Sequence, residues 1–289
     1  MNDQPHITGS TKYIGLIGSS VRYSLSPVVH NAAFKEMGLD YAYVAFDVDP
    51  INLLDAMRGM KALGFLGYNV TAPLKKAIVP YLDEVSKVAE LCDAVNTVVI
   101  QNGRLLGDNG DGSAFMRTLV MDGVNILGKK ITVLGAGGTG SAIVAQAALD
   151  GVAQIDLYNQ MDDFFAPAQG LIERVSEVSD TEIMLRSLDD AAALRRSLAE
   201  SQLVVNATTM GEPQNPGCLL GPDMLHPGLV VAEMVYVPQD TELVRMAADA
   251  GNKVIDGADV FLQQASMGER LWLGREMPID FIAEEFFED

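Results

Sequence analysis

The sequence predicts an α/β protein of two domains, and three observations support this. Strand-like and helix-like segments alternate along the chain, which favours parallel sheets covered by helices. A stretch dense in turn-forming residues, 108–112, interrupts the alternation and indicates a boundary. The length of 289 residues is close to twice the ~150 residues of a typical domain. We therefore expect two α/β domains separated by a cleft.

In the first half, strands and helices are expected to alternate up to this boundary. The predicted strands cover residues 13–18, 41–48 and 67–71, and the predicted helices cover 27–37, 53–63 and a short stretch after Pro73. Apolar residues at helical spacing mark the first helix, and Gly38 is a suitable residue to end it.

Composition restricts the class of protein. Apolar residues make up 48% of the chain and charged residues 20%, which is enough to build packed cores. Twenty basic residues against 39 acidic ones leave a net charge of −19, whereas a nucleic-acid binder would need a basic surface. No apolar run is long enough to span a membrane, and the first residues lack the features of a signal peptide. We expect a cytoplasmic enzyme that acts on small molecules.

Cysteine and histidine give no sign of a disulfide framework or a metal site. Two cysteines, Cys92 and Cys218, are too few for such a framework and favour a reducing compartment. The three histidines, His6, His30 and His226, show no metal-ligand spacing, and each is interpreted as a surface or core residue. The sequence leaves the oligomeric state open, a homodimer included.

The second half contains a strand, a glycine-rich turn and a helix in direct succession. After a helix over 113–121, the predicted strand 130–134 leads into Gly-x-Gly-x-x-Gly, and a helix over 141–149 and a strand over 154–158 follow. The spacing alone also fits an ordinary tight turn, but this context favours a Rossmann-type dinucleotide site. Glycines let the backbone approach a pyrophosphate, and amides at the helix start can bind its charge. The candidate cofactor residues are Gly135, Ala136, Gly137, Gly138, Thr139 and Gly140.

Several further motifs occur in an order that resembles the shikimate dehydrogenase family, over about residues 13–274. The motifs are Tyr23–Pro27, Asn69–Lys75, Ala94–Thr97, Asn109–Asp111, Asn206–Gly211, Tyr236–Pro238 and Gln264–Ala265. The run Asp162–Phe165 is most similar to the quinate/shikimate dehydrogenase branch. The resemblance implies reversible NAD(P)-dependent oxidation of shikimate, quinate or both at C3 to the 3-dehydro acid, within the shikimate pathway to aromatic amino acids.

The resemblance also implies catalytic roles for two residues. Lys75 matches the lysine of the family that handles the proton, which an alcohol must lose together with its hydride. Asp111 matches the aspartate that orients this lysine and a substrate hydroxyl. Taken singly, Lys75 could be a solvated lysine, for which Lys76 is the better candidate, and Asp111 could form a turn or cap a helix.

Six further residues match substrate-binding positions of the family. Ser24 and Ser26 match the pair that binds the substrate carboxylate, although serines in this place also cap helices. The residues that match contacts to ring hydroxyls are Thr71, Asn96 and Gln264. Tyr236 matches a tyrosine that lies between cofactor and substrate in the family, and it is equally interpretable as a half-buried core aromatic. Asn69 is expected only to brace the end of its strand.

We expect residues 1–112 and 260–289 to form the substrate-binding domain and residues 113–259 to form the dinucleotide-binding domain. The remaining cofactor candidates are Asn159, Asp162, Thr209 and Gly257. NADP-preferring relatives carry an arginine after the second strand of the nucleotide domain, whereas this chain has Gln160 there. Asp162 would repel a 2′-phosphate and accept hydrogen bonds from ribose hydroxyls, unless it only caps the next helix. The sequence therefore predicts NAD as the preferred cofactor, with NADP weaker.

Four positions depart from the family pattern and argue against strict specificity for shikimate. Tyr23 stands where histidine is common, Gly110 where threonine is usual, and Glu212 where a methionine generally lies against the nicotinamide. Tyr68 is expected to add a phenol near the floor of the substrate pocket. Two alternatives follow: a dehydrogenase of an amino- or otherwise modified cyclitol carboxylate, or a non-catalytic sensor of the ligand. Retention of both Lys75 and Asp111 favours an enzyme.

Overall fold

The computed structural model describes residues 7–19 and 21–287 and divides into two compact units. Unit 1 comprises Met1–Gly110 with Leu262–Asp289, and unit 2 comprises Asp111–Phe261. The expected boundaries, after residues 112 and 259, each lie close to these divisions. His6, the first five residues, which lack the features of a signal peptide, and the last two residues all lie outside the described residues.

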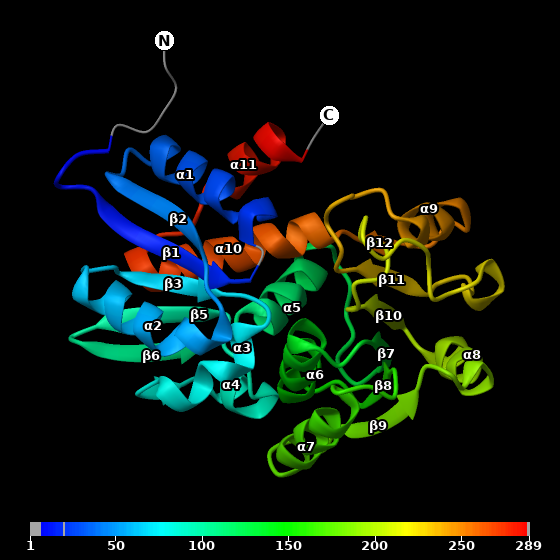
Figure 1. Ribbon diagram of the computed structural model, residues 1–289. Coiled ribbons are helices and arrows are strands. Elements are labelled where there is room, and N and C mark those ends of the chain that lie inside the picture. The colour runs from blue at the N-terminus through cyan, green and yellow to red at the C-terminus, as the bar shows by residue number, and fades with distance from the viewer. Residues whose placement is uncertain (1–6, 20, 288–289) are drawn as a thin grey trace. The chain divides into compact units, whose positions relative to one another are not determined.

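The sheet of unit 1 has the strand order β2-β1-β3-β5-β6-β4 (Figure 1). Its strands are β1 (Lys12–Gly18), β2 (Tyr41–Asp47), β3 (Gly67–Val70), β4 (Glu84–Val85), β5 (Thr97–Gln101) and β6 (Arg104–Asp108). The alternation of segments predicts parallel architecture, but this sheet is mixed, because β5 runs antiparallel to both β3 and β6. Asn102 and Gly103 form the β5–β6 turn with φ of 51° and 76°, and Asn-Gly is a strong signal for such a hairpin.

Helices cover both faces of this sheet. They are η1 (Val21–Tyr23), α1 (Ser26–Glu36), η2 (Pro50–Asn52), α2 (Leu53–Ala62), α3 (Leu74–Ala77), η3 (Val79–Tyr81), α4 (Lys87–Cys92), α10 (Gly257–Leu273) and α11 (Ile279–Phe286). Side chains of β1 alternate between two cores, as the period of a strand requires. Ile14 packs with Phe34 of α1 and Trp272 of α10, whereas Ile17 packs with Met57 of α2.

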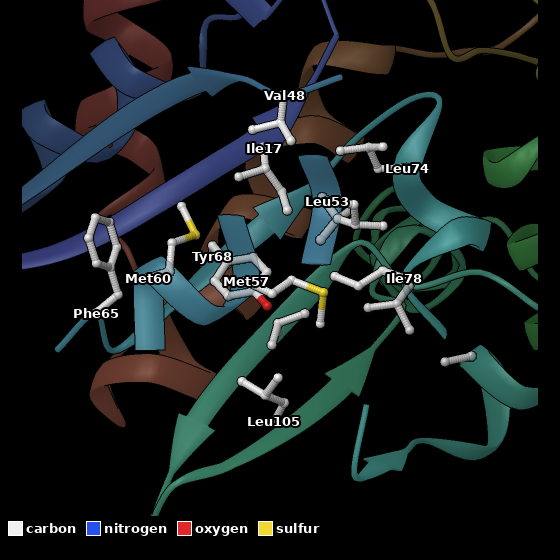
Figure 2. Close-up of a cluster of buried hydrophobic side chains, with 14 residues drawn as sticks. Ile17, Val48, Leu53, Met57, Met60, Phe65, Tyr68, Leu74, Ile78 and Leu105 are labelled. Carbon is white, nitrogen blue, oxygen red and sulfur yellow. The ribbon is translucent and has the colours of Figure 1, made fainter. Parts of the chain in front are cut away.

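Tyr68 belongs to the second of these cores and not to the floor of a pocket. Its side chain is fully buried and lies beside Met57 and Met60 among aliphatic groups (Figure 2). Burial raises the pKa of the phenol, and its hydroxyl has no hydrogen-bond partner. The expectation for Tyr68 is therefore wrong, because its strand position points it to the face opposite Asn69.

Unit 2 contains a parallel sheet in the order β12-β11-β10-β7-β8-β9 (Figure 1). The strands are β7 (Lys130–Leu134), β8 (Gln154–Asn159), β9 (Glu182–Ser187), β10 (Leu203–Asn206), β11 (Val230–Glu233) and β12 (Val254–Ile255). Renumbered within the unit this is the order 3-2-1-4-5-6 of the Rossmann fold, in which chain direction across the sheet reverses between β7 and β10. The predicted fold class is confirmed.

The helices of unit 2 lie on both faces of its sheet. They are α5 (Asp111–Met121), α6 (Gly138–Asp150), α7 (Phe165–Ser176), α8 (Ala191–Glu200), η4 (Pro222–Met224) and α9 (Glu242–Asp249). Leu194 of α8 and Leu243 of α9 share one core with Leu134 of β7. A Cβ at Gly112 of α5 would overlap the carbonyl oxygen of Ala142 in α6. Within the described residues, no helix is long and apolar enough to cross a membrane.

Candidate active site

The three spaced glycines of the turn after β7 differ in what the absence of a side chain allows. Gly135 has φ of 99°, and a Cβ there would lie 2.9 Å from Ala207 O. A Cβ at Gly140 would overlap the carbonyl oxygen of Gly135, so only glycine lets α6 start this close to β7. Gly137 precedes α6 with an ordinary φ of −69° and open space at its Cβ position. Absence of a side chain there leaves room for a ligand over the helix start.

The start of α6 has the properties of an anion-binding site. The first amides of a helix lack partners within the helix and carry its positive dipole end. No side chain caps α6, and Thr139 in its first turn donates a hydrogen bond to Asp111 Oδ2 at 3.2 Å. The turn therefore links the cofactor candidate Thr139 with the catalytic candidate Asp111, which is itself the first residue of α5.

Asn159 and Asp162 brace the turn from the end of β8. Asn159 Oδ1 accepts a hydrogen bond from the amide of Ala136 at 2.9 Å, and its Nδ2 donates to Asp162 Oδ1 at 2.8 Å. Asp162 Oδ1 also accepts from the amide of Phe164 at 2.9 Å, so this residue orders the loop before α7. Asp162 is nevertheless exposed, and its other oxygen stays available as an acceptor at the carboxyl edge of the sheet.

The loops after β10 and β11 and the start of α10 lie at the same edge of the sheet. Thr209 is exposed and accepts a hydrogen bond from Asn215 Nδ2 at 3.0 Å. Gly257 packs closely, because a Cβ there would lie 2.7 Å from Glu233 O. Glu233 itself is almost fully buried at the end of β11 and was not among the sequence candidates. An acidic residue directly after three apolar strand residues is the signal that would have identified it.

Tyr236, Glu212 and Asp111 form an electrostatically coupled group in unit 2. The ring of Tyr236 stacks on that of Phe261, with centroids 4.7 Å apart. Burial, and next the charges of Asp111 and Glu212, raise the pKa of the Tyr236 phenol. Burial also raises the pKa of Glu212. The phenol therefore stays protonated and available as a hydrogen-bond donor.

In unit 1, Thr71, Lys75 and Asn96 lie where β3 ends and β5 begins. The amide of Val70 donates to Asn96 O, and the amide of Val95 donates to Lys75 O, both at 2.8 Å. Lys75 is half-buried, whereas Lys76 is exposed and pairs with Asp93 at 2.8 Å. The solvated role therefore fits Lys76 better, as the sequence suggested.

Asn69 braces this group, as expected. Its Oδ1 accepts from the hydroxyl of Tyr43 at 2.7 Å, and its Nδ2 donates to Asn96 O at 3.0 Å and Thr97 Oγ1 at 3.1 Å. Asn96 Oδ1 in turn accepts from the amide of Gly110 at 3.0 Å. Buried amides satisfied in this way hold their neighbours in one geometry.

The remaining substrate candidates lie near the same edge of the unit 1 sheet. Ser24 and Ser26 follow β1, and Ser24 Oγ accepts a hydrogen bond from the amide of Ser26 at the start of α1. A Cβ at Gly110 would lie 4.0 Å from Gln264 Cγ, which brings Gln264 of α10 next to the Asn96 network. Tyr23 is 78% exposed, so it belongs to the surface beside these serines.

The two described histidines have structural partners. His30 is buried, with Nδ1 2.8 Å from Glu269 Oε1, and His226 contacts backbone oxygens. Over residues 7–19 and 21–287, no three histidine, cysteine or acidic side chains form a metal-binding group.

Comparison with known proteins agrees with both units. Residues 16–98 match the family model described as the shikimate dehydrogenase substrate binding domain. The chain is 43% identical over 283 residues to "Shikimate dehydrogenase (NADP(+))" of Listeria monocytogenes serotype 4b, covering 97% of each protein. It belongs to the shikimate dehydrogenase family. The match covers 97% of the chain, so the family relationship includes unit 2 as well as the substrate-binding part.

Two solved members of this structural group carry ligands. Shikimate 5-dehydrogenase from Listeria monocytogenes, in complex with shikimate and NAD, is 42% identical with a TM-score of 0.93, covering 98% of this chain and 99% of the other. Quinate dehydrogenase from Corynebacterium glutamicum, in complex with NAD, is 31% identical with a TM-score of 0.85, covering 96% and 99%. The protein is accordingly an NAD(P)-dependent oxidoreductase of the shikimate dehydrogenase family.

Substitutions of two glycines in the turn should separate packing from ligand access. We expect Gly140→Ala to destabilise the protein by about 1–3 kcal/mol, because the new methyl group overlaps a backbone oxygen. Gly137→Ala should leave the melting temperature nearly unchanged but weaken NADH binding by at least ~10-fold, since this glycine permits the approach of a pyrophosphate. Thermal unfolding and fluorescence titration with NADH measure the two effects. Normal NADH affinity in a folded Gly137→Ala variant would contradict the assignment of the turn.

Proposed function

We propose that the protein catalyses the reversible oxidation of shikimate, quinate or both at C3, giving the 3-dehydro acid. The proposal is based on the grouping of Thr71, Lys75 and Asn96 at one edge of the unit 1 sheet, where backbone hydrogen bonds join their segments. The 43% identity to a curated shikimate dehydrogenase over 97% of the chain supports it. Shikimate in the L. monocytogenes structure and the quinate dehydrogenase from C. glutamicum support this pair of substrates.

Oxidation of the C3 alcohol requires loss of a hydride from carbon and a proton from oxygen. The nicotinamide, when bound, supplies the hydride acceptor. We propose that Lys75 Nζ accepts this proton as a general base, and that Asp111 orients Lys75 and a substrate hydroxyl. In the reverse direction the Lys75 ammonium returns the proton to the forming alcohol.

Neutral and hydroxyl side chains take the binding roles in this proposal. The hydroxyls of Ser24 and Ser26 bind the substrate carboxylate at the start of α1, where the helix dipole favours an anion. The groups assigned to the ring hydroxyls are Thr71, Asn96 and Gln264. Tyr236 provides an O–H donor beside the substrate, consistent with its raised pKa.

The residues of unit 2 fit a dinucleotide. Open space over Gly137 and the uncapped start of α6 suit a pyrophosphate. Asp162 in the loop after β8 suits an unmodified ribose, and the proposed cofactor site extends over Gly135–Gly140, Asn159, Thr209 and Gly257. We propose NAD as the preferred cofactor, although the L. monocytogenes relative is named for NADP(+).

A second candidate substrate class is favoured by Glu212. This carboxyl group is half-buried and electrostatically coupled to Tyr236. A cationic amino group on a cyclitol carboxylate would find a complementary charge there. The candidate is therefore a dehydrogenase of an amino-substituted analogue.

A substrate panel tests the function directly. Shikimate, quinate and their amino analogues are each assayed with NAD and NADP by the absorbance of the reduced nicotinamide. We expect turnover with shikimate or quinate, and an amino analogue as the best substrate only if the second candidate holds. Absence of cofactor reduction with shikimate and quinate, under conditions where the folded protein binds NADH, would refute the leading proposal.

Lys75→Met tests the assignment of the proton. Its kcat should fall by at least ~10²-fold, the low end for general acid–base catalysis, with a much smaller change in KM for substrate. Lys76→Met is the matched control, because the neighbouring Lys76 is exposed and pairs with Asp93. Near-normal turnover of folded Lys75→Met would remove Lys75 from the mechanism.

Cofactor choice can be tested at the loop after β8. We expect kcat/KM to favour NAD over NADP by at least ~10-fold, because Gln160 stands where an arginine would offer the 2′-phosphate a charge-assisted bond of roughly 1.5–3 kcal/mol. Arg186 of the adjacent strand β9 lies with its Nε 3.9 Å from Asp156 Oδ1. The double variant Gln160→Arg with Asp162→Ser should shift preference toward NADP. Equal or better efficiency with NADP in the unmodified enzyme would overturn the proposed preference.

A further inference from the structure

Glu233 is a buried carboxylate at the end of β11 that no proposed catalytic step uses. Its side chain is 1% exposed, and it accepts hydrogen bonds from three different segments. Oε1 accepts from Asn206 Nδ2 at 2.8 Å and from the amide of Val235 at 3.1 Å. Oε2 accepts from the hydroxyl of Thr241 at 3.0 Å, which also caps α9. One side chain therefore joins the ends of β10 and β11 to the start of α9.

Asn206 carries this connection into the loop after β10. Its Nδ2 also donates to Met210 O at 2.9 Å, and its Oδ1 accepts from Thr208 Oγ1 at 2.6 Å. Gly211 closes the loop with φ of 109°, and a Cβ there would lie 3.6 Å from Glu233 Oε2. The loop over residues 207–211 is thus folded directly onto the Glu233 carboxylate.

These loops lie on the side of the sheet that the nicotinamide half of a dinucleotide would occupy. In a doubly wound sheet the ligand crosses the switch point between the first and fourth strands, and the acidic residue after the second strand binds the adenosine ribose. Here β7, β8 and β10 take those places. The other half of the dinucleotide then extends toward the loops after β10 and β11, which carry Thr209 and Tyr236.

We propose that Glu233 is a positioning residue for the nicotinamide end of the cofactor site. It acts through Asn206 on the loop 207–211 and through Val235 on the adjacent Tyr236. This inference rests on the proposed function, because it concerns the geometry needed for hydride transfer. Small displacements of such a geometry reduce the rate strongly.

The ionised form of Glu233 destabilises the folded protein, because its charge is buried. Burial raises its pKa to about 7, and the hydrogen bonds from Val235, Thr241 and Asn206 only partly oppose this. Since the folded pKa lies above the ordinary value of 4.5, the folded state binds the proton more tightly. Stability therefore falls as pH rises from about 4.5 to about 7 and changes no further above that range.

Other titratable groups lie on or near the elements adjacent to β11. Cys218 has a pKa raised by burial and then by the charges of Glu242 and Glu233. Glu242 begins α9. Asp256 follows β12, the neighbour of β11, and burial raises its pKa also. When variant and wild type are compared at the same pH, the contributions of these groups to stability and activity cancel wherever they are equal in the two proteins.

The test compares wild type with Glu233→Gln, in which the amide reproduces the hydrogen-bonding pattern of a protonated carboxyl group. Asp156→Asn is the matched control, because Asp156 is an equally buried carboxylate of the same sheet that bonds to Ser197 and Lys130. The measurements are kcat and KM with shikimate or quinate, Kd for NADH by fluorescence, and urea unfolding, each between pH 5.5 and 8.5.

At pH 8 we expect Glu233→Gln to lower kcat at least ~10-fold, to weaken NADH binding and to leave substrate KM nearly unchanged. The kcat ratio of wild type to variant should shrink as pH falls through about 7. Wild type should lose stability as pH rises toward about 7, whereas the stability of the variant should not fall in this way. Asp156→Asn should leave kcat and NADH affinity nearly unchanged.

Two outcomes would overturn the inference. One is equal kcat and equal NADH affinity of wild type and Glu233→Gln at pH 8. The other is an equal loss in Asp156→Asn, which would indicate a general effect of removing a buried charge. If wild type oxidises neither shikimate nor quinate, the proposed function fails, and the NADH affinities alone then decide the role of Glu233.

Discussion

The close approach of α6 to the end of β7 is the constraint on which unit 2 depends. Only glycine at position 140 allows this approach, because any side chain would overlap the backbone of Gly135. The approach directs the free amides of the helix start toward the carboxyl edge of the sheet. A protein of net charge −19 can then attract an anionic cofactor through local dipoles despite its overall charge.

The side chains around this turn transmit its position to neighbouring strands. Asn159 fixes the turn from β8, Thr139 connects it to Asp111, and a Cβ at Gly135 would press on Ala207 after β10. Asn206 and Glu233 then continue the same edge to β11. Unit 1 shows a comparable arrangement. Asn69 donates a hydrogen bond to the backbone oxygen of Asn96, while its neighbour Tyr68 packs in the hydrophobic core. In both units, buried amides position the chemical groups at strand ends.

Local sequence patterns predicted much of this. The strand over residues 130–134, the glycine spacing and the bracing role of Asn69 depend on short-range chemistry that a sequence displays directly. The antiparallel β5–β6 pair was missed because alternation of segments does not determine strand direction, although Asn102–Gly103 signalled a hairpin. Tyr68 was misplaced because a strand exposes neighbouring residues to opposite faces. Glu233 directly follows three apolar strand residues, which is a local signal of its burial, but its partners Asn206 and Thr241 lie elsewhere in the chain and no local pattern identifies them.

We propose that the start of α6, which no side chain caps, binds the pyrophosphate of the cofactor. A crystal structure of the protein with NADH tests this most directly. We expect pyrophosphate oxygens at hydrogen-bond distance, about 3 Å, from amide nitrogens in the first turn of α6, with the nicotinamide toward Thr209 and Tyr236. A pyrophosphate bound away from α6, or a nicotinamide on the side of β8 and β9, would refute this binding mode.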